Sequence, residues 1–310
     1  MRSSIFLALK GVAMGLAEVV PGVSGGTIAF ITGIYDRLID AIKGFDAGLW
    51  KAWQEGGFGA VWRRIDGAFL FTLLTGMVVG VVTGVFTIAH LLKTYPVPLW
   101  AFFFGLILAS IWYVGRQLTF SLSVLFFLLL GTVVALGVVM GVPAEGNQAL
   151  WFVFVSGALA VSALMLPGLS GSFVLLLLGM YSYILPTAKA FLSNPSWGDF
   201  QVVFVFGLGM LFGLVSFSHL LSFLLHHYHQ RMYALLTGFM LGSLYKIWPW
   251  QAAEISQTVV RHGEGMPERL RPVWPSDFPG DPMLFWALGA MVLGVVLVLS
   301  FSLFPSRQEK

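Results

Sequence analysis

Two short stretches carry the residues whose types and spacing point to chemistry. Residues 21–26 read Pro-Gly-Val-Ser-Gly-Gly, and residues 167–172 read Pro-Gly-Leu-Ser-Gly-Ser. Each interrupts an apolar run with proline, which cannot continue a helix, and with glycines, which let other groups approach the backbone. The N–H groups freed where a helix restarts, together with the motif hydroxyls, are donors suited to an anion. The pattern predicts an anion site at two broken helices.

The helices are expected to restart at Thr27 and Ser172, with the breaks buried in protein because unsatisfied backbone is costly at membrane depth. The residues expected to bind the substrate are Glu18, Pro21, Gly22, Ser24, Gly25, Gly26, Thr27, Arg37, Pro167, Gly168, Ser170, Gly171 and Ser172. The alternative is that the glycines only permit close helix packing, as small residues do in membranes. Two breaks at matching positions favour the binding site.

Two charged residues beside the first motif sharpen this prediction. An ionisable group inside a membrane segment is a functional candidate by default. Arg37 is suited to holding a phosphate bidentately, and the alternative is a local pair with Asp36 or Asp40. Glu18 is expected to carry a proton, or to pair with Arg37 or Lys10 when the site is empty.

The composition places these motifs in a membrane protein. Hydrophobic residues make up 58% of the 310, charged residues 10%, and the mean hydropathy is +0.87, whereas a soluble domain has about 25% charged residues. The chain has no cysteine, which excludes disulfides and thiolate sites. No spacing predicts a metal or cofactor, and no basic block predicts nucleic acid binding.

The apolar runs give the expected elements. Residues 1–20 are interpreted as a retained first segment rather than a cleaved signal. The stretch between residues 43 and 66, with Trp50, Trp53 and Trp62 beside basic residues, is typical of an interfacial segment at headgroup level. The expected apolar segments are 5–20, 27–42, 67–92, 97–114 and 118–142, then 149–166, 172–190, 199–225, 232–250 and 283–304.

The two halves of the chain are copies of each other. Eight residues recur 146 positions later: Pro21, Gly22, Ser24, Gly25, Gly33, Tyr35, Lys43 and Phe45 match Pro167, Gly168, Ser170, Gly171, Gly179, Tyr181, Lys189 and Phe191. A weaker echo pairs residues 101–110 with residues 234–243. The repeats are expected to span 1–142 and 149–310, the second carrying an extramembrane loop at 251–282. Internal repeats of this kind are typical of transporters.

The number of crossings decides how the copies are oriented. If each broken segment is a re-entrant hairpin, each half has three true crossings and the repeats are inverted. If each broken helix crosses fully, the repeats are parallel. The distribution of lysine and arginine favours the inverted arrangement with the N-terminus inside. The predicted fold class is an all-α polytopic membrane protein with two inverted repeats, each a re-entrant broken-helix hairpin plus about three transmembrane helices.

The stretches "AMGLAEVVPGVSGGTIAFITGIYDRLI" and "LMLPGLSGSFVLLLLGMYSYIL" resemble the paired signatures of the bacterial polyprenyl-phosphate transporter family, and the resemblance covers nearly the whole chain. It implies a multi-pass protein of the bacterial plasma membrane that returns undecaprenyl phosphate from the outer to the inner leaflet. It also implies that the motif residues form the headgroup site. Proton and sodium both stay open as coupling ions, since an intramembrane carboxylate suits ion coupling.

Two other functions stay open at this point. Membrane undecaprenyl pyrophosphate phosphatases also carry duplicated broken helices, but they place an arginine after the motif serine, where this chain has Gly25 and Gly171. Phosphoryl transfer needs such charge neutralisation. An ion-coupled transporter for a small anion would also use an intramembrane carboxylate.

Overall fold

The computed structural model describes residues 2–20, 23–141, 144, 146–254 and 269–303, so Pro21 and Gly22 of the first motif lie outside the described residues. The helices are α1 (Arg2–Glu18), α2 (Gly25–Ile31), α3 (Tyr35–Lys43), α4 (Gly48–Arg64), α5 (Gly67–Thr94), α6 (Pro96–Gly115), α7 (Leu122–Val139), α8 (Leu150–Met165), α9 (Gly171–Leu177), α10 (Tyr181–Ser193), α11 (Trp197–His227), α12 (His229–Ser243) and α13 (Leu284–Leu303). Two short strands, β1 (Gln251–Glu254) and β2 (Arg269–Pro272), precede a 3₁₀ turn at Pro275–Asp277.

Some of the helices reach the length that is needed to cross a bilayer. Among the described residues, α5, α6, α7 and α11 are long and apolar enough to cross a membrane. The bent pair α9 and α10 brings the number to five if it counts as one span. Helix α8 and the part of α13 from Leu284 to Ser300 are apolar but shorter. The structure therefore confirms an all-α polytopic membrane protein, while α12 ends at Ser243 rather than at residue 250 as predicted.

Each break is followed by a sharp turn that the sequence did not predict. The apolar segments 27–42 and 172–190 are not single helices, because α2 turns into α3 and α9 turns into α10. The turns contain Gly33 and Gly179, with φ of 69° and 66°, a conformation that glycine adopts without steric cost. The second turn bends the chain by 114°. The repeated glycine pair therefore marks the point where each hairpin changes direction.

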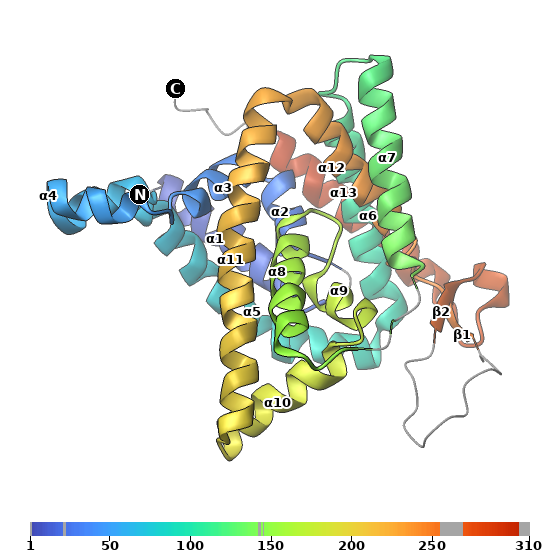
Figure 1. Ribbon diagram of the computed structural model, residues 1–310. Coiled ribbons are helices and arrows are strands. Elements are labelled where there is room, and N and C mark those ends of the chain that lie inside the picture. Colours follow the sequence, from blue (N-terminus) through green and yellow to red (C-terminus); the bar gives the residue numbers. More distant parts are fainter. Residues whose placement is uncertain (1, 21–22, 142–143, 145, 255–268, 304–310) are drawn as a thin grey trace.

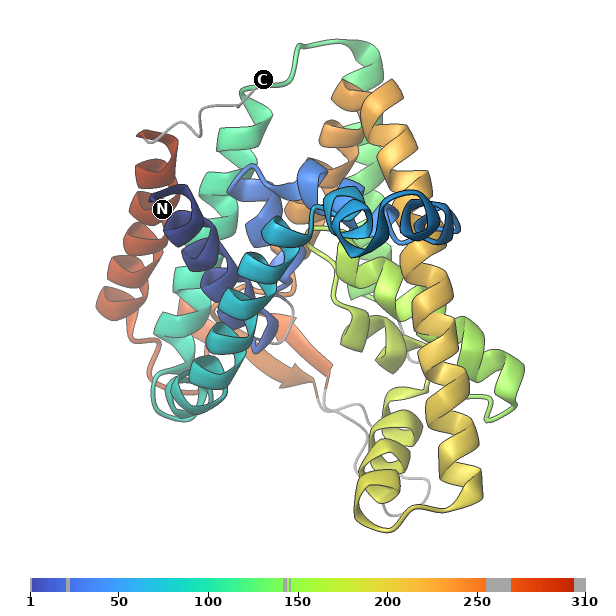
Figure 2. The ribbon, with the colours of Figure 1, turned by 90° about the vertical axis from the view of Figure 1, so that its left-hand side faces the viewer.

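Close helix pairs join along glycine-lined faces. Gly11 and Gly15 of α1 lie against the backbone of α5, and Gly209 and Gly213 of α11 lie against the backbone of α8. A side chain at any of these glycines would collide with backbone atoms of the partner helix. Small residues let membrane helices approach closely, which strengthens their van der Waals contact. Figure 2 shows α1 lying alongside α5.

The remaining long helices pair across the two halves of the chain. Gly105 and Gly294 bring α6 and α13 together, and Gly131 and Gly238 bring α7 and α12 together. Helix α6 belongs to the first half and α13 to the second, and the same is true of α7 and α12. Each half therefore completes its packing with helices of the other, as Figure 2 shows for α6 and α13.

The first hairpin lies in the core between the halves. Tyr35 is buried and its ring contacts Phe30, which in turn contacts Tyr233 of α12. Helix α3 packs against α11, which runs the full height of the molecule in Figure 1, with α10 at its lower end and α12 at its upper end. The core thus fixes the first hairpin against helices of the second half.

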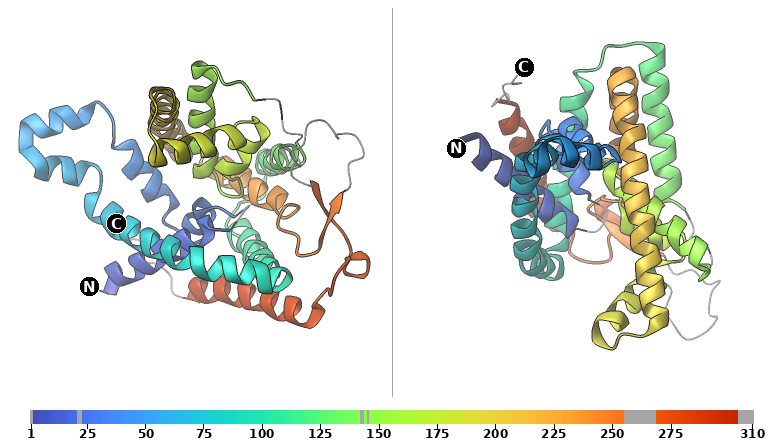
Figure 3. Two further views of the ribbon diagram at one scale, coloured as in Figure 1. Left: turned by 90° about the horizontal axis from the view of Figure 1, so that it is seen from below. Right: turned by 60° about the vertical axis from the view of Figure 1, so that its left-hand side comes forward.

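Helix α4 projects from the body of the molecule (Figures 1 and 3). It has no buried residue, and it is bent at Gly56 and Gly57, whose backbone is not helical. Trp50 and Trp53 are 70% and 53% exposed. Exposed tryptophans on a projecting helix suit the headgroup level of a bilayer, and that placement stays a prediction.

An ion pair closes the base of α4. The Arg64 guanidinium donates to both carboxylate oxygens of Asp46 over 2.7 and 2.8 Å, and the Gly48 N–H donates to the same carboxylate over 2.8 Å. Partial burial raises the pKa of Asp46, but these hydrogen bonds outweigh it and lower the pKa below its ordinary value. The two ends of α4 are thereby held together.

The predicted extramembrane loop forms a small cap. Strands β1 and β2 pair antiparallel, and Figure 1 places them at one side of the bundle. Trp250 is buried with Val97, Ala101 and Ala287, which come from α6 and α13. The indole N–H of Trp250 donates to the carbonyl of Pro282 over 2.9 Å. The described part of the cap is thus anchored on the ends of two helices.

Candidate functional site

The first break lies between the end of α1 at Glu18 and the start of α2 at Gly25. Helix α2 begins two residues earlier than the predicted restart at Thr27. Ser24 is its N-cap, with extended backbone and a hydroxyl that accepts a hydrogen bond from the Gly26 N–H over 3.1 Å. A serine in this position satisfies one of the free donors of the first turn, so the helix starts directly after it.

Glu18 closes the first break. Its Oε1 accepts a hydrogen bond from the Gly25 N–H over 2.6 Å, a charge-assisted contact of the stronger class when the carboxyl is ionised. In the described part of the chain, Glu18 forms no ion pair with Arg37 or Lys10. The Lys10 ammonium donates instead to the Thr32 carbonyl over 2.8 Å. The Glu18 carboxylate therefore already accepts a hydrogen bond from the Gly25 N–H, which was predicted to bind a substrate anion.

The second break lies between Met165 at the end of α8 and Gly171 at the start of α9. The hydroxyls of Ser170 and Ser172 lie 2.9 Å apart, and Ser172 is exposed. In the first break, by contrast, Ser24 is only 1% exposed. The hydroxyls of the second break are thus more accessible than those of the first.

The two breaks touch each other. The Thr27 hydroxyl, in a side chain with 0% exposure, accepts a hydrogen bond from the Gly168 N–H over 2.9 Å. The Ser24 hydroxyl donates to the Leu164 carbonyl over 3.1 Å. A Cβ on Gly26 would come within 3.1 Å of that same carbonyl oxygen. The two motifs, which are far apart in sequence, therefore form one polar cluster.

Tyr35 adds a contact that the sequence analysis did not assign to the site. Its buried hydroxyl donates to the Met165 carbonyl, the last residue of α8, over 2.9 Å. This satisfies a carbonyl that the broken helix leaves without an intrahelical partner. The sequence does carry a signal for this residue, because Tyr35 is among the residues that recur in the second half, where it matches Tyr181.

Two glycines of the second motif lie against backbone. A Cβ on Gly168 would approach the Phe239 carbonyl oxygen of α12 to 2.8 Å. A Cβ on Gly171 would approach the Ala160 carbonyl oxygen of α8 to 2.5 Å. Both separations are shorter than any carbon side chain tolerates without movement. The packing role left open for these glycines is therefore present in the structure, and it holds the second break between α8 and α12.

The structure does not bring Arg37 to the breaks. Its Nε lies 2.6 Å from a carboxylate oxygen of Asp66, and its side chain is 59% exposed. The guanidinium also lies 4.5 Å from the centroid of the Phe69 ring. A local ion pair was the alternative for Arg37, but the partner is Asp66 rather than Asp36 or Asp40.

Other titratable groups pair where α3 meets α11 and α12. The Asp40 carboxylate accepts a hydrogen bond from the Ser222 hydroxyl over 2.7 Å and lies 3.6 Å from Nε2 of His226. Tyr233 of α12 donates to the carboxylate of Asp36. Among the described residues, no group of three or more histidines and carboxylates is placed to hold a metal ion.

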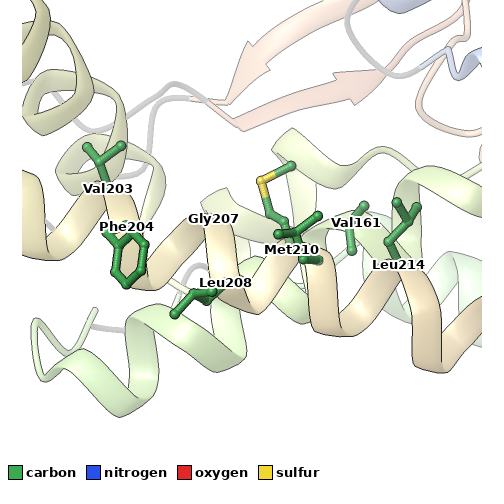
Figure 4. Close-up of a pocket in the computed structure, with 8 residues that line it drawn as sticks. Val161, Val203, Phe204, Gly207, Leu208, Met210 and Leu214 are labelled. Atoms are coloured by element: carbon green, nitrogen blue, oxygen red, sulfur yellow. The ribbon is translucent and has the colours of Figure 1, made fainter. Parts of the chain in front are cut away.

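An apolar groove runs along α11 beside the second break. Its volume is about 480 Å³, and Figure 4 shows side chains of α11 with Val161 of α8 along it. The lining residues are Val161, Val203, Phe204, Gly207, Leu208, Met210, Leu211 and Leu214. Val161 directly follows Ala160, whose carbonyl lies against Gly171. The groove is therefore apolar, and one of its lining residues is next in sequence to a residue that contacts the second motif.

The profile of the undecaprenyl phosphate translocase-like family matches residues 14–266. The chain belongs to this family. The match includes both motifs and every residue of the predicted site, and it confirms the family resemblance that the two motifs indicated. A polyprenyl-phosphate transporter of Vibrio cholerae is 43% identical over 306 residues, which cover 96% of each chain.

A second relative is more distant. The polyprenyl-phosphate transporter of Staphylococcus aureus is 29% identical over 257 residues, covering 78% of this chain and 85% of its own length. No solved structure matches the chain significantly. Family membership therefore rests on sequence, and the geometry of the site rests on the structure described above.

Proposed function

We propose that this protein is a translocase that returns undecaprenyl phosphate from the outer to the inner leaflet of the bacterial plasma membrane. The observation that carries the proposal is the contact between the two breaks, which joins the buried hydroxyls of Ser24 and Thr27 to the second half of the chain in one polar cluster. Family membership and the names of both relatives, which are polyprenyl-phosphate transporters, support the same substrate class.

The substrate has two parts that need different surroundings. Its phosphate requires hydrogen-bond donors. The hydroxyls of Ser170 and Ser172 lie on the accessible side of the cluster, whereas the N–H groups of Gly25, Gly26 and Gly168 already donate within the protein and would have to be released first. Its polyprenyl chain requires an apolar path, and the groove between α8 and α11 is lined by such residues (Figure 4). In the proposed mode of binding, the phosphate lies at the polar cluster while the chain lies along the groove and into the lipid.

Transport requires access from both sides of the membrane. We infer that the repeats are inverted, because α5, α6 and α7 give the first half three crossings if its broken hairpin is re-entrant. The pairing of α6 with α13 is matched by that of α12 with α7, as expected for two halves related by a pseudo-two-fold axis. Inverted repeats with broken helices are a recurrent arrangement for alternating access. The contacts between the breaks then mark the midpoint about which the halves rearrange.

Glu18 is the proposed point of coupling. When its carboxyl holds the Gly25 N–H, that donor is closed to a phosphate. Protonation, or sodium bound at the carboxylate, would weaken this contact and free the donor. Movement of the lipid would thereby be linked to movement of a cation.

The enzymatic alternative has less support. Gly25 and Gly171 follow the motif serines, so neither break carries an arginine at that position to neutralise charge on a transferred phosphoryl group. Arg37 does not replace it, since it is paired with Asp66.

Liposomes that carry undecaprenyl phosphate or undecaprenyl pyrophosphate in one leaflet test the proposal. The accessibility of the headgroup and the release of inorganic phosphate are followed over time, with and without a pH or sodium gradient. We expect the monophosphate to change leaflet without phosphate release. Release of phosphate from the pyrophosphate would favour an enzyme, and no movement under any gradient would leave a small anion as the better substrate.

A further inference from the structure

A lysine that belongs to neither motif lies beside the second break. Lys246 follows α12, and its ammonium nitrogen lies 4.7 Å from the centroid of the Phe173 ring. Phe173 is the residue after Ser172, within the first turn of α9. The cation therefore lies against the residue that directly follows the second motif, although it comes from a segment 73 positions further along the chain.

The described residues around this ammonium include no counter-charge. In the portion of the chain that the structure describes, no carboxylate lies within ion-pair distance of Lys246, and its side chain is partly buried. A partly buried cation without a charged partner has lost part of its hydration without compensation. The face of the Phe173 ring offsets part of this cost through its quadrupole, but an aromatic ring carries no net charge. An anionic ligand would complete the site.

Helix α12 is held in the position that delivers the lysine. The Phe239 carbonyl and the Met240 amide lie against Gly168, so α12 is packed directly on the second motif. The chain then turns after Ser243, where the Lys246 N–H donates to the Ser243 carbonyl over 2.9 Å. The lysine thus comes from an element whose distance to the break is fixed by backbone contact.

The hydroxyls on this side of the cluster are the accessible ones. Thr27 and Ser24 use their oxygens in contacts between the breaks, whereas Ser170 and Ser172 bond to each other and Ser172 is exposed. Charge is divided in the same way, with the Glu18 carboxyl at the first break and the Lys246 ammonium beside the second. A phosphate is repelled by the first charge and attracted by the other.

We propose that Lys246 is the cation that binds the phosphate monoester of the substrate, together with the hydroxyls of Ser170 and Ser172. The proposal rests on the proposed function, and it assigns the headgroup to the second break. Lysine acts there as a point charge with three donors, and the hydroxyls supply direction. Selectivity for a charged headgroup over the corresponding alcohol follows from the same residues.

Binding of farnesyl phosphate, a short prenyl monophosphate, to the purified full-length protein tests this. Native mass spectrometry reports the bound fraction of folded protein for the natural chain, Lys246→Met, Lys246→Arg and Lys189→Met. Lys189 is an exposed lysine of α10, so its replacement removes the same charge away from the break. Farnesol and inorganic phosphate are measured alongside.

We expect Lys246→Met to bind farnesyl phosphate roughly 10- to 100-fold more weakly, the effect of losing a hydrogen bond to a charged group. Lys246→Arg keeps most of the affinity, Lys189→Met is unchanged, and farnesol binding is the same for every variant. Inorganic phosphate should compete with farnesyl phosphate in the natural chain but not in Lys246→Met. This result would show that the lysine binds phosphate whether or not the phosphate is attached to a lipid.

The outcomes separate the two proposals. Tight binding by the natural chain with equal binding by Lys246→Met overturns the role of the lysine and leaves the proposed function standing. Loss of affinity in Lys246→Arg as severe as in Lys246→Met contradicts a role for the charge. No binding of farnesyl phosphate by the natural chain overturns both proposals.

Discussion

The hydrogen bond between the two breaks gives the sharpest prediction about the fold of the site. The Thr27 hydroxyl accepts from the Gly168 N–H over 2.9 Å, and the Thr27 side chain is fully buried. Thr27→Val keeps the size and branching of the side chain but removes the acceptor. The Gly168 N–H is then left without its partner inside the protein.

The magnitude follows from the cost of an unpaired buried donor, which is about 1–3 kcal/mol. A loss of this size lowers a melting temperature by roughly 2–4 °C for each kcal/mol in domains of 150–250 residues, and we expect a shift of several degrees here. Thr27→Ser keeps the hydroxyl and loses only a methyl group, worth about 1 kcal/mol. The valine variant should also bind farnesyl phosphate more weakly, because Gly168 positions the second motif.

Thr32→Val is the matched control. The Thr32 hydroxyl donates to the Ile28 carbonyl over 2.8 Å, and that carbonyl also accepts from the Thr32 N–H. The same substitution therefore leaves no group unpaired, and its effect should stay below about 0.5 kcal/mol. The assay is thermal unfolding of the purified protein in one detergent for all variants. Equal melting temperatures for Thr27→Val and the natural chain would refute the argument, as would an equal loss in Thr32→Val.

Three further substitutions have defined outcomes. Gly171→Ala places a Cβ 2.5 Å from the Ala160 carbonyl oxygen, so it should destabilise the protein by about 1–3 kcal/mol; an unchanged melting curve would contradict the close packing. Arg37→Met removes an exposed ion pair with Asp66 and should cost at most about 1 kcal/mol, with lipid movement retained; loss of transport in a stable variant would return Arg37 to the site. Glu18→Gln keeps an acceptor for the backbone N–H but cannot ionise, so transport should lose its dependence on an imposed pH or sodium gradient, and an undiminished dependence would exclude Glu18 from coupling.

Much of the fold was predictable from apolar run length and from the repeat. The expected segments 67–92 and 97–114 correspond closely to α5 and α6, because long apolar runs have few alternatives in a bilayer. The family was predictable from the motifs. The turns at Gly33 and Gly179 were not predicted, since an isolated glycine in an apolar run is compatible with a continuing helix.

The contacts of the site were less predictable, because they depend on which segments meet in space. Sequence placed Arg37 near the first motif but gave no information on Asp66, which is 29 residues away and captures its side chain. Lys246 had no neighbouring motif to draw attention to it, and only the packing of α12 on Gly168 brings it to Phe173. The two breaks were predicted from their prolines and glycines, whereas the contacts between the two halves at the breaks were not.

The central claim is that the phosphate of the lipid binds where the two breaks meet, and a single cysteine tests it most directly. The chain has no cysteine of its own, so Ser172→Cys in the second motif and Ser193→Cys at the exposed end of α10 each provide one reactive thiol. The rate of labelling by a methanethiosulfonate reagent is measured in the reconstituted protein. Saturating undecaprenyl phosphate should slow labelling at position 172 and leave position 193 unchanged, while undecaprenol protects neither. Equal labelling of position 172 with and without undecaprenyl phosphate would contradict the account.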